Sequence, residues 1–108
     1  MTVWFVSRHP GAIDWARQQG LQIDRWVTHL DTGAPEPGDT IIGSLPAGTA
    51  AELCARGIRY LHLQLDLPEE WRGRELTKEQ LVKACARLIE LDVQVVAPEA
   101  SRTGIAGE

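Results

Sequence analysis

Residues 2–20 read TVWFVSRHPGAIDWARQQG and determine the fold class of the chain. Thr2–Ser7 consists mainly of β-branched and aromatic residues without a charge, which predicts a buried β-strand. Pro10 and Gly11 interrupt that strand, and Ala12–Gln19 has the apolar spacing of a short helix. A strand that passes through a short turn into a helix is the unit from which parallel α/β sheets are built.

The alternation of strands and helices continues along the chain. Three further strands are predicted at Asp24–Leu30, Asp39–Gly43 and Ile58–Leu65, with a helix over Ala47–Arg56 between the last two. Residues 66–74 contain proline and glycine and are predicted to be irregular. Crossovers of this length predict an α/β fold whose sheet of four to five strands is mostly parallel, with helices on both faces.

The clearest helix signal begins at Thr77, which has the spacing of a capping box with Gln80. An apolar stripe at helical spacing then follows, formed by Leu81, Cys85, Leu88 and Ile89. This pattern predicts one helix that continues to about residue 89. Cys54 and Cys85, the two cysteines, both lie on such stripes, so we expect small buried hydrophobic side chains rather than a disulfide or metal ligands.

With 108 residues the chain has room for one domain with one core. We expect this domain to span residues 1–97, with Val93–Ala97 as a last edge strand. The polar, glycine-containing tail from 98 to 108 is expected to be flexible. No apolar run approaches the roughly 18 residues that cross a bilayer, and the start of the chain lacks the charge order of a signal peptide. The expected location is cytoplasmic, without a membrane partner.

The formal net charge of −4 argues against a long nucleic-acid groove, so DNA is not an expected partner. Only Lys78 and Lys83 are lysines, whereas nine side chains are arginines. The planar guanidinium group of arginine matches two phosphate oxygens at once. This composition favours a compact anionic ligand that is bound at a local site.

Ser7-Arg8-His9 follows the first predicted strand, at the end of the sheet where parallel α/β proteins bind ligands. The start of the next helix offers free backbone N–H groups and a dipole that favours an anion. Ser7 adds a hydroxyl, Arg8 a bidentate cation and His9 a group that titrates near neutrality. These three residues are the candidate catalytic residues, and Gly11 is a candidate ligand contact. The alternative is a solvated arginine and an ordinary turn histidine.

Two other segments fall at the same end of the predicted sheet. Gly43-Ser44-Leu45-Pro46 combines a glycine, which allows close backbone approach, with a possible helix N-cap at Ser44. Trp71 and Arg72 place an aromatic plane beside a guanidinium group, which suits a base and its phosphate. Both segments are candidate ligand-binding sites. The alternatives are a capped helix without a ligand and a tryptophan that only fixes its loop to the core.

His62 alternates within the predicted fourth strand, and we expect it to be a hydrogen-bonded structural histidine. The three histidines are far apart in sequence, and none pairs with a carboxylate at helical spacing, so no metal site is predicted. The chain also lacks a GxGxxG or Walker-type loop. No cofactor is therefore expected.

Four blocks of sequence resemble a small ancillary family of type III CRISPR systems, the Csx-sixteen family. These blocks are WFVSRHPGA (4–12), GDTIIGSLP (38–46), YLHL (60–63) and LPEEWRGREL (67–76). The resemblance covers about residues 2–90, and the agreement of several separate blocks makes it more specific than any single motif. The resemblance weakens after Asp92.

The resemblance implies ring nuclease activity, which is the cleavage of cyclic oligoadenylate second messengers, here most simply cyclic tetra-adenylate. It also implies a Rossmann-like fold related to the nucleotide-sensing CARF domains of CRISPR effectors, which work as two-fold dimers. A ribose 2′-OH can attack the adjacent phosphorus without a metal ion if it is held in line, which leaves positioning and charge stabilisation to the protein. In that reaction Arg8 would neutralise phosphate oxygens, Ser7 would orient them and His9 would assist proton transfer.

Two alternatives stay open at the level of sequence. One is a sensor or sequestering protein that binds the cyclic ligand without cutting it. The other is a phosphohistidine-type phosphatase, because Arg8-His9 after a first parallel strand resembles the R-H-G signature of that class. Pro10 replaces the glycine of that signature, and the chain is too short for the usual helical insertions.

Overall fold

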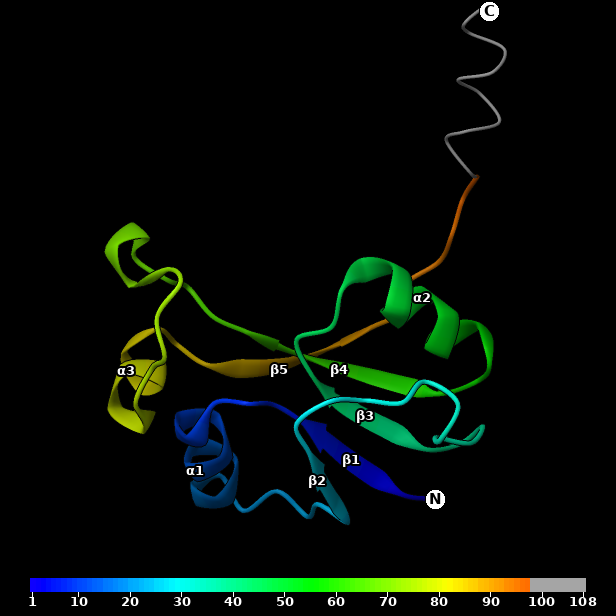
Figure 1. The fold of residues 1–108 in the computed structure, drawn as a ribbon, viewed down its shortest axis with the longest axis horizontal. Helices are drawn as coiled ribbons and strands as arrows, with labels where there is room; N and C mark the ends of the chain where they lie inside the picture. Colours follow the sequence, from blue (N-terminus) through cyan, green and yellow to red (C-terminus); the bar gives the residue numbers. More distant parts are fainter. Residues whose placement is uncertain (98–108) are drawn as a thin grey trace, which may run out of the picture.

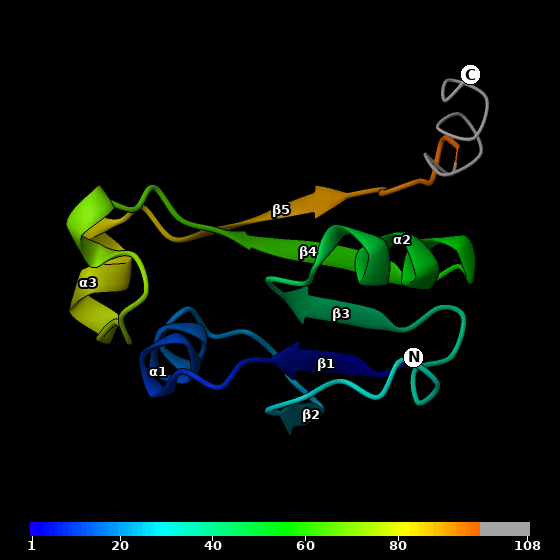
Figure 2. The ribbon, with the colours of Figure 1, turned by 45° about the horizontal axis from the view of Figure 1, so that its top comes forward.

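The computed structural model describes residues 1–97 and confirms the alternation of strands and helices. The elements in chain order are β1 (Val3–Val6), α1 (Pro10–Gln18), β2 (Arg25–Val27), β3 (Thr40–Gly43), α2 (Ala47–Ala55), β4 (Arg59–Gln64), the 3-10 turn η1 (Glu69–Trp71), α3 (Lys78–Lys83) and β5 (Arg87–Leu91). The strands form one sheet in the order β2-β1-β3-β4-β5 (Figures 1 and 2). β1 to β4 run parallel and β5 pairs antiparallel with β4, so the predicted α/β class with a mostly parallel sheet is correct.

The helices cover both faces of the sheet, as predicted. On one face, Phe5, Ile42 and Leu63 pack with Trp15 of α1 and Leu81 of α3. On the opposite face, Trp4 and Ile41 pack with Leu53 of α2 and with Ile58. Neighbouring residues of one strand therefore contribute to different cores, as the two-residue period of a β-strand requires.

A buried carboxylate ties the beginning of the chain to the sheet. Asp39 accepts hydrogen bonds from the backbone N–H groups of Thr2 at 2.9 Å and Glu36 at 3.0 Å, and from the indole N–H of Trp4 at 3.2 Å. The hydrogen bonds from Thr2 and Glu36 lower the pKa of Asp39 below its ordinary value, against the opposing effect of burial. The folded state therefore favours the ionised carboxylate of Asp39.

The segment after α3 differs from the sequence-based expectation. The helix that begins at the predicted capping box of Thr77 ends at Lys83, and Cys85 adopts a left-handed backbone conformation with φ of 56°. The chain then forms the edge strand β5, in which Leu88 pairs with Leu63 and packs on the core, while Cys85 is exposed. The predicted helix to residue 89 and the predicted burial of Cys85 were wrong, because Leu88 and Ile89 also fit a strand that can pair with β4.

Smaller differences concern the ends of elements. The edge strand expected at Val93–Ala97 is absent from the described residues, because β5 occupies the edge of the sheet beside β4. Residues 66–74, which were expected to be irregular, contain the single turn η1. The predicted flexible tail, 98–108, lies outside the described residues. Among residues 1–97, every helix is too short to cross a membrane.

Candidate functional site

The carboxyl ends of β1, β3 and β4 lie side by side at one edge of the sheet (Figure 2). Val6 pairs with Gly43, and Gly43 pairs with His62, so these three residues form one row across the sheet. The turns that follow Val6 and Gly43 therefore begin next to each other. This is the edge at which open parallel sheets bind ligands, since the turns there lead into helix N-termini.

The turn Ser7-Arg8-His9 joins β1 to α1. The backbone N–H of His9 donates to the Ser7 hydroxyl oxygen at 3.0 Å, and His9 is the N-cap residue of α1, with Pro10 at its first position. The side chains of Arg8 and His9 are exposed, and neither makes a hydrogen bond or an ion pair within residues 1–97. The guanidinium group of Arg8 and the imidazole ring of His9 are therefore accessible beside the N-terminus of α1, an arrangement that suits an anion.

Gly11 is buried where α1 meets the segment before α3. A Cβ atom at Gly11 would overlap the carbonyl oxygen of Leu76, so the packing of this segment against α1 requires glycine. A depression of about 400 Å³ lies beside this contact, and its charged lining residues are Asp14, Glu75, Lys78 and Glu79. Because three of these four residues are acidic, the depression does not suit phosphate. The contact of Gly11 with a ligand stays a prediction.

The segment Gly43-Ser44-Leu45-Pro46 joins β3 to α2. A Cβ atom at Gly43 would lie 2.7 Å from the carbonyl oxygen of Val6. The glycine therefore allows the backbone of β1, and not a ligand, to approach β3 closely. Pro46 is the N-cap residue of α2, and the Ser44 hydroxyl donates to the carbonyl of Leu63 at 2.9 Å. The predicted N-cap at Ser44 was therefore wrong, since this hydroxyl fixes the turn to β4.

Tyr60 and His62, on β4, form the best-connected polar group at this edge. The hydroxyl oxygen of Tyr60 lies 2.7 Å from Nδ1 of His62 and accepts the backbone N–H of Leu45 at 2.9 Å. It also lies 3.3 Å from the carbonyl oxygen of Gly43, to which it can donate. Burial raises the pKa of Tyr60 above its ordinary value, whereas the hydrogen bond from Leu45 lowers it. The prediction of a hydrogen-bonded histidine at position 62 is confirmed.

Tyr60 was not among the candidate residues from sequence. Its contact with Leu45 joins residues 15 positions apart, and no local pattern encodes such a contact. A usable signal was present nonetheless: Tyr60 and His62 are two positions apart in a predicted strand, so they share one face of the sheet.

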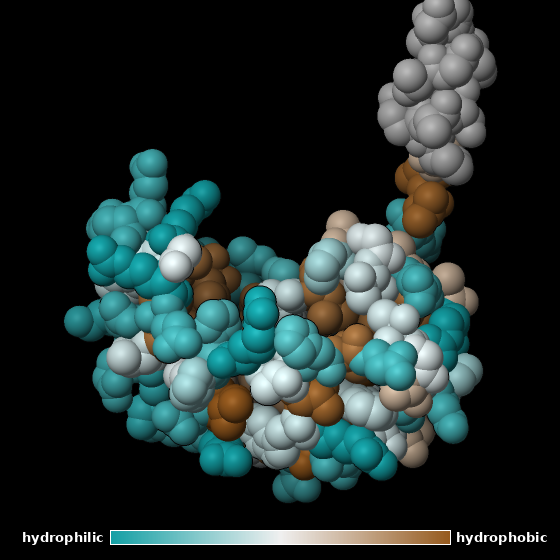
Figure 3. Space-filling model, viewed as in Figure 1, coloured by the Kyte–Doolittle hydropathy of each residue, from teal (hydrophilic) through white to brown (hydrophobic). Residues whose placement is uncertain are grey.

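Trp71 and Arg72 follow β4, in the yellow-green segment of Figure 1. Trp71 ends η1 and is half-buried, and Arg72 is exposed. Figure 3 shows a molecular surface that is hollowed between this segment and α2. Within residues 1–97 no hydrogen bond connects Trp71 or Arg72 to the turns after β1 and β3. The structure therefore places the third candidate segment at the same end of the sheet but does not join it to the others.

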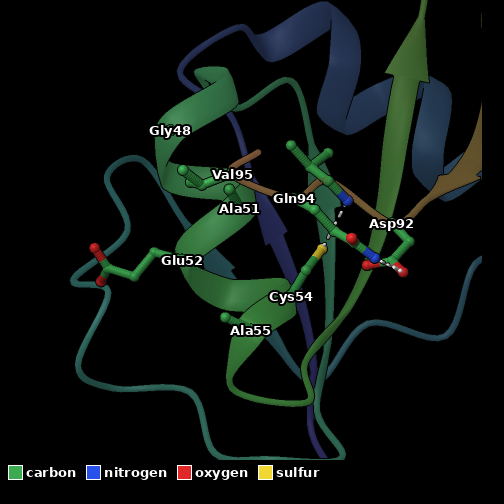
Figure 4. A pocket seen from close by; sticks show the side chains of 9 residues that line it. Gly48, Ala51, Glu52, Cys54, Ala55, Asp92, Gln94 and Val95 are labelled. Atoms are coloured by element: carbon green, nitrogen blue, oxygen red, sulfur yellow. Dashed lines mark hydrogen bonds between the residues drawn. The ribbon is translucent and has the colours of Figure 1, made fainter. Parts of the chain in front are cut away.

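A larger depression, of about 660 Å³, lies between α2 and residues 92–95 (Figure 4). Its lining consists mostly of small or apolar residues, and its two charged residues are Glu52 and Asp92. Without a positive charge, this depression does not match a phosphate ligand. Cys54 borders it as a free thiol that accepts the N–H of Val93 at 3.5 Å.

The fold and the site together define a small Rossmann-like α/β protein with polar turns at the ligand-binding edge of its sheet. Residues 4–94 match the model of a family described as "Putative CRISPR-associated protein (Cas_VVA1548)". The chain belongs to this CRISPR-associated family. No curated protein and no solved structure matches it.

Proposed function

We propose that this protein is a ring nuclease that cleaves a cyclic oligoadenylate second messenger, most simply cyclic tetra-adenylate, of type III CRISPR signalling. The observation that carries the proposal is the exposed Arg8-His9 pair at the N-terminus of α1, beside the turn that follows β3. Membership of a CRISPR-associated family is consistent with a role in such signalling. The resemblance of four sequence blocks to the Csx-sixteen family supplies the identity of the ligand.

The proposed reaction uses a nucleophile that the substrate itself carries. The ribose 2′-oxygen attacks the adjacent phosphorus, the bond from phosphorus to the 5′-oxygen breaks, and a linear product with a 2′,3′-cyclic phosphate forms. The protein holds the attacking and leaving oxygens in line and stabilises negative charge on the phosphorane. Arg8 contacts the non-bridging oxygens, and the dipole of α1 adds to the positive potential at its N-terminus.

Two alternatives share the same anion-binding geometry. A sensor would bind the cyclic ligand and leave it intact. A phosphohistidine-type phosphatase would act on monoesters through Arg8 and His9. The chemistry of the products separates these alternatives from the ring nuclease.

Incubation of the purified protein with cyclic tetra-adenylate in EDTA, followed by separation of the products, tests the proposal. A ring nuclease that needs no metal yields linear fragments with cyclic phosphate ends. Intact ligand that stays in a complex indicates a sensor, and inorganic phosphate from monoester substrates indicates a phosphatase. Cleavage that occurs only when Mg²⁺ or Mn²⁺ replaces EDTA would contradict the metal-independent mechanism.

A further inference from the structure

His62 lies next to the edge strand β5, on the face of the sheet opposite to α1 and α3. Leu61 and Leu63 pack on the core beneath α1 and α3, so Tyr60 and His62 face the side of α2. In the row across the sheet, His62 lies between Gly43, which has no side chain, and Ile89, which is 37% exposed. His62 is itself partly exposed and therefore borders open surface.

Tyr60 fixes the imidazole ring of His62. The Tyr60 oxygen has two lone pairs and one proton, and three polar atoms surround it: Nδ1 of His62, N–H of Leu45 and the carbonyl oxygen of Gly43. When the Tyr60 proton points to Gly43, Nδ1–H of His62 donates to Tyr60, and all of these bonds are made. Nε2 of His62 then carries a lone pair that can accept a proton.

The same contacts accommodate the protonated ring. An imidazolium keeps its Nδ1–H bond to Tyr60, so uptake of a proton at Nε2 needs no movement of heavy atoms. His9 offers no comparable orientation, because its ring has no hydrogen-bond partner within residues 1–97. A group that transfers protons in catalysis must be held in place, and the fold holds His62.

Two arginines belong to the end of the sheet that carries His62, and one of them is paired with a carboxylate. Arg87 pairs with Gln64, two residues along β4 from His62, and forms a half-exposed ion pair with Asp66 at 3.2 Å. Arg8 lies two residues after Val6, which belongs to the same row of the sheet as His62. Two guanidinium groups therefore belong to the same end of the sheet as the imidazole.

We propose that His62 is the residue that accepts the 2′-OH proton during cleavage, with Tyr60 as its positioning residue. This inference rests on the proposed function and assigns the proton transfer to His62 instead of His9. The proton moves from the 2′-oxygen to Nε2 as the bond from that oxygen to phosphorus forms. The bond from phosphorus to the 5′-oxygen breaks, that oxygen takes up a proton from solvent, and the imidazolium releases its proton to solvent. The phosphodiester is rearranged, and no water is consumed.

The test compares single-turnover cleavage of cyclic tetra-adenylate by the wild-type protein and by His62→Asn, Tyr60→Phe and His29→Asn. The asparagine at position 62 keeps a polar atom within reach of Tyr60 but removes Nε2. We expect His62→Asn to lower the cleavage rate by about 10²–10⁴-fold, the usual contribution of a general base, with unchanged ligand affinity. His29→Asn controls for the loss of an exposed imidazole that follows β2, three strands from β4, and should cleave normally.

Chemical rescue separates catalysis from a structural role. Added imidazole should restore part of the cleavage by His62→Ala and none of the loss in Arg8→Ala. Tyr60→Phe should lower the rate and leave the affinity for the ligand intact. Cleavage by His62→Asn at the wild-type rate would overturn this inference and leave the proposed function in place. A folded wild-type protein that does not cleave the ring would overturn both.

Discussion

Arg8 is the residue whose substitution should affect function and leave folding unchanged. Its side chain is exposed and makes no hydrogen bond or ion pair within residues 1–97, so the fold does not depend on its charge. We predict that Arg8→Ala lowers ring cleavage by about 10²-fold or more, the range for a lost charge-assisted contact in an active site. Kinetic assays measure the loss of cleavage, and thermal unfolding of the same preparation checks that the stability of the fold is unchanged.

Arg59 provides the matched control for this substitution. It begins β4 at the opposite end of the sheet, where it forms an exposed ion pair with Glu90 at 3.0 Å. Arg59→Ala should cleave the ring normally, because an exposed ion pair contributes little and lies far from the proposed site. Equal activity of Arg8→Ala and Arg59→Ala would remove Arg8 from the site.

Asp39 makes stability depend on pH in acid. Its pKa is lowered in the folded state, so the ionised carboxylate stabilises the fold above the unfolded pKa, near 3.8, and this stabilisation is lost as the pH falls through the lower folded value. Asp39→Asn should lower the free energy of unfolding at pH 7 by about 1–3 kcal/mol, since the partners of a buried acceptor are left poorly satisfied.

Urea unfolding of wild-type protein and Asp39→Asn between pH 7 and pH 2.5 tests this pH dependence. The difference between the two proteins should shrink as the pH falls below about 4, where the Asp39 carboxyl of the unfolded wild-type chain begins to take up its proton. A difference that stays constant down to the lowest pH would show that the charge of Asp39 does not stabilise the fold.

At the scale of the elements, Trp71 in the segment that carries η1 has two candidate roles, and the first is that this segment closes over the ligand. The ring is half-buried and Arg72 next to it is exposed, and the segment that carries them borders the hollow of Figure 3. If the segment closes over the ligand, Trp71→Ala should weaken binding by about 1–3 kcal/mol, the range for a stacked base. The part of the tryptophan fluorescence that Trp71→Ala removes should also become shielded from quenchers on binding.

The competing role is a side chain that fixes the loop to the core. In that case Trp71→Ala lowers the melting temperature, while the folded fraction binds the cyclic ligand as tightly as the wild type. Measurement of both quantities on one variant decides between the two roles.

The strand-turn-helix unit at the start of the chain could be predicted because its signals are local. Residues 84–91 could not, because Leu81, Cys85, Leu88 and Ile89 fit a helical stripe as well as a strand. The segment forms a strand because Leu88 pairs with Leu63 and because Cys85 adopts a left-handed backbone conformation. Both features depend on tertiary structure. The Tyr60 contacts escaped prediction for the same reason, whereas the candidate turns were found because strand ends define them.

At the scale of the whole molecule, one copy of the turn after β1 is small beside a ring with four phosphates. A two-fold dimer could present the same turn to opposite phosphates of the ring, and closed two-fold symmetry is the commonest arrangement of soluble oligomers. We predict a homodimer that binds one cyclic tetra-adenylate per two chains. Sedimentation and calorimetric titration measure these two quantities. A monomer at micromolar concentration that still cleaves, or one ligand per chain, would contradict the prediction.

The mass of the product in H₂¹⁸O tests the central claim most directly. Attack by the 2′-oxygen rearranges the phosphodiester without water, so the linear product has the mass of the intact ring, or half that mass after two cuts. We predict cleavage in EDTA to products that end in a cyclic phosphate and contain no ¹⁸O. An intact ring, or a product that has gained the mass of one labelled water in its terminal phosphate at the earliest time points, would contradict the claim.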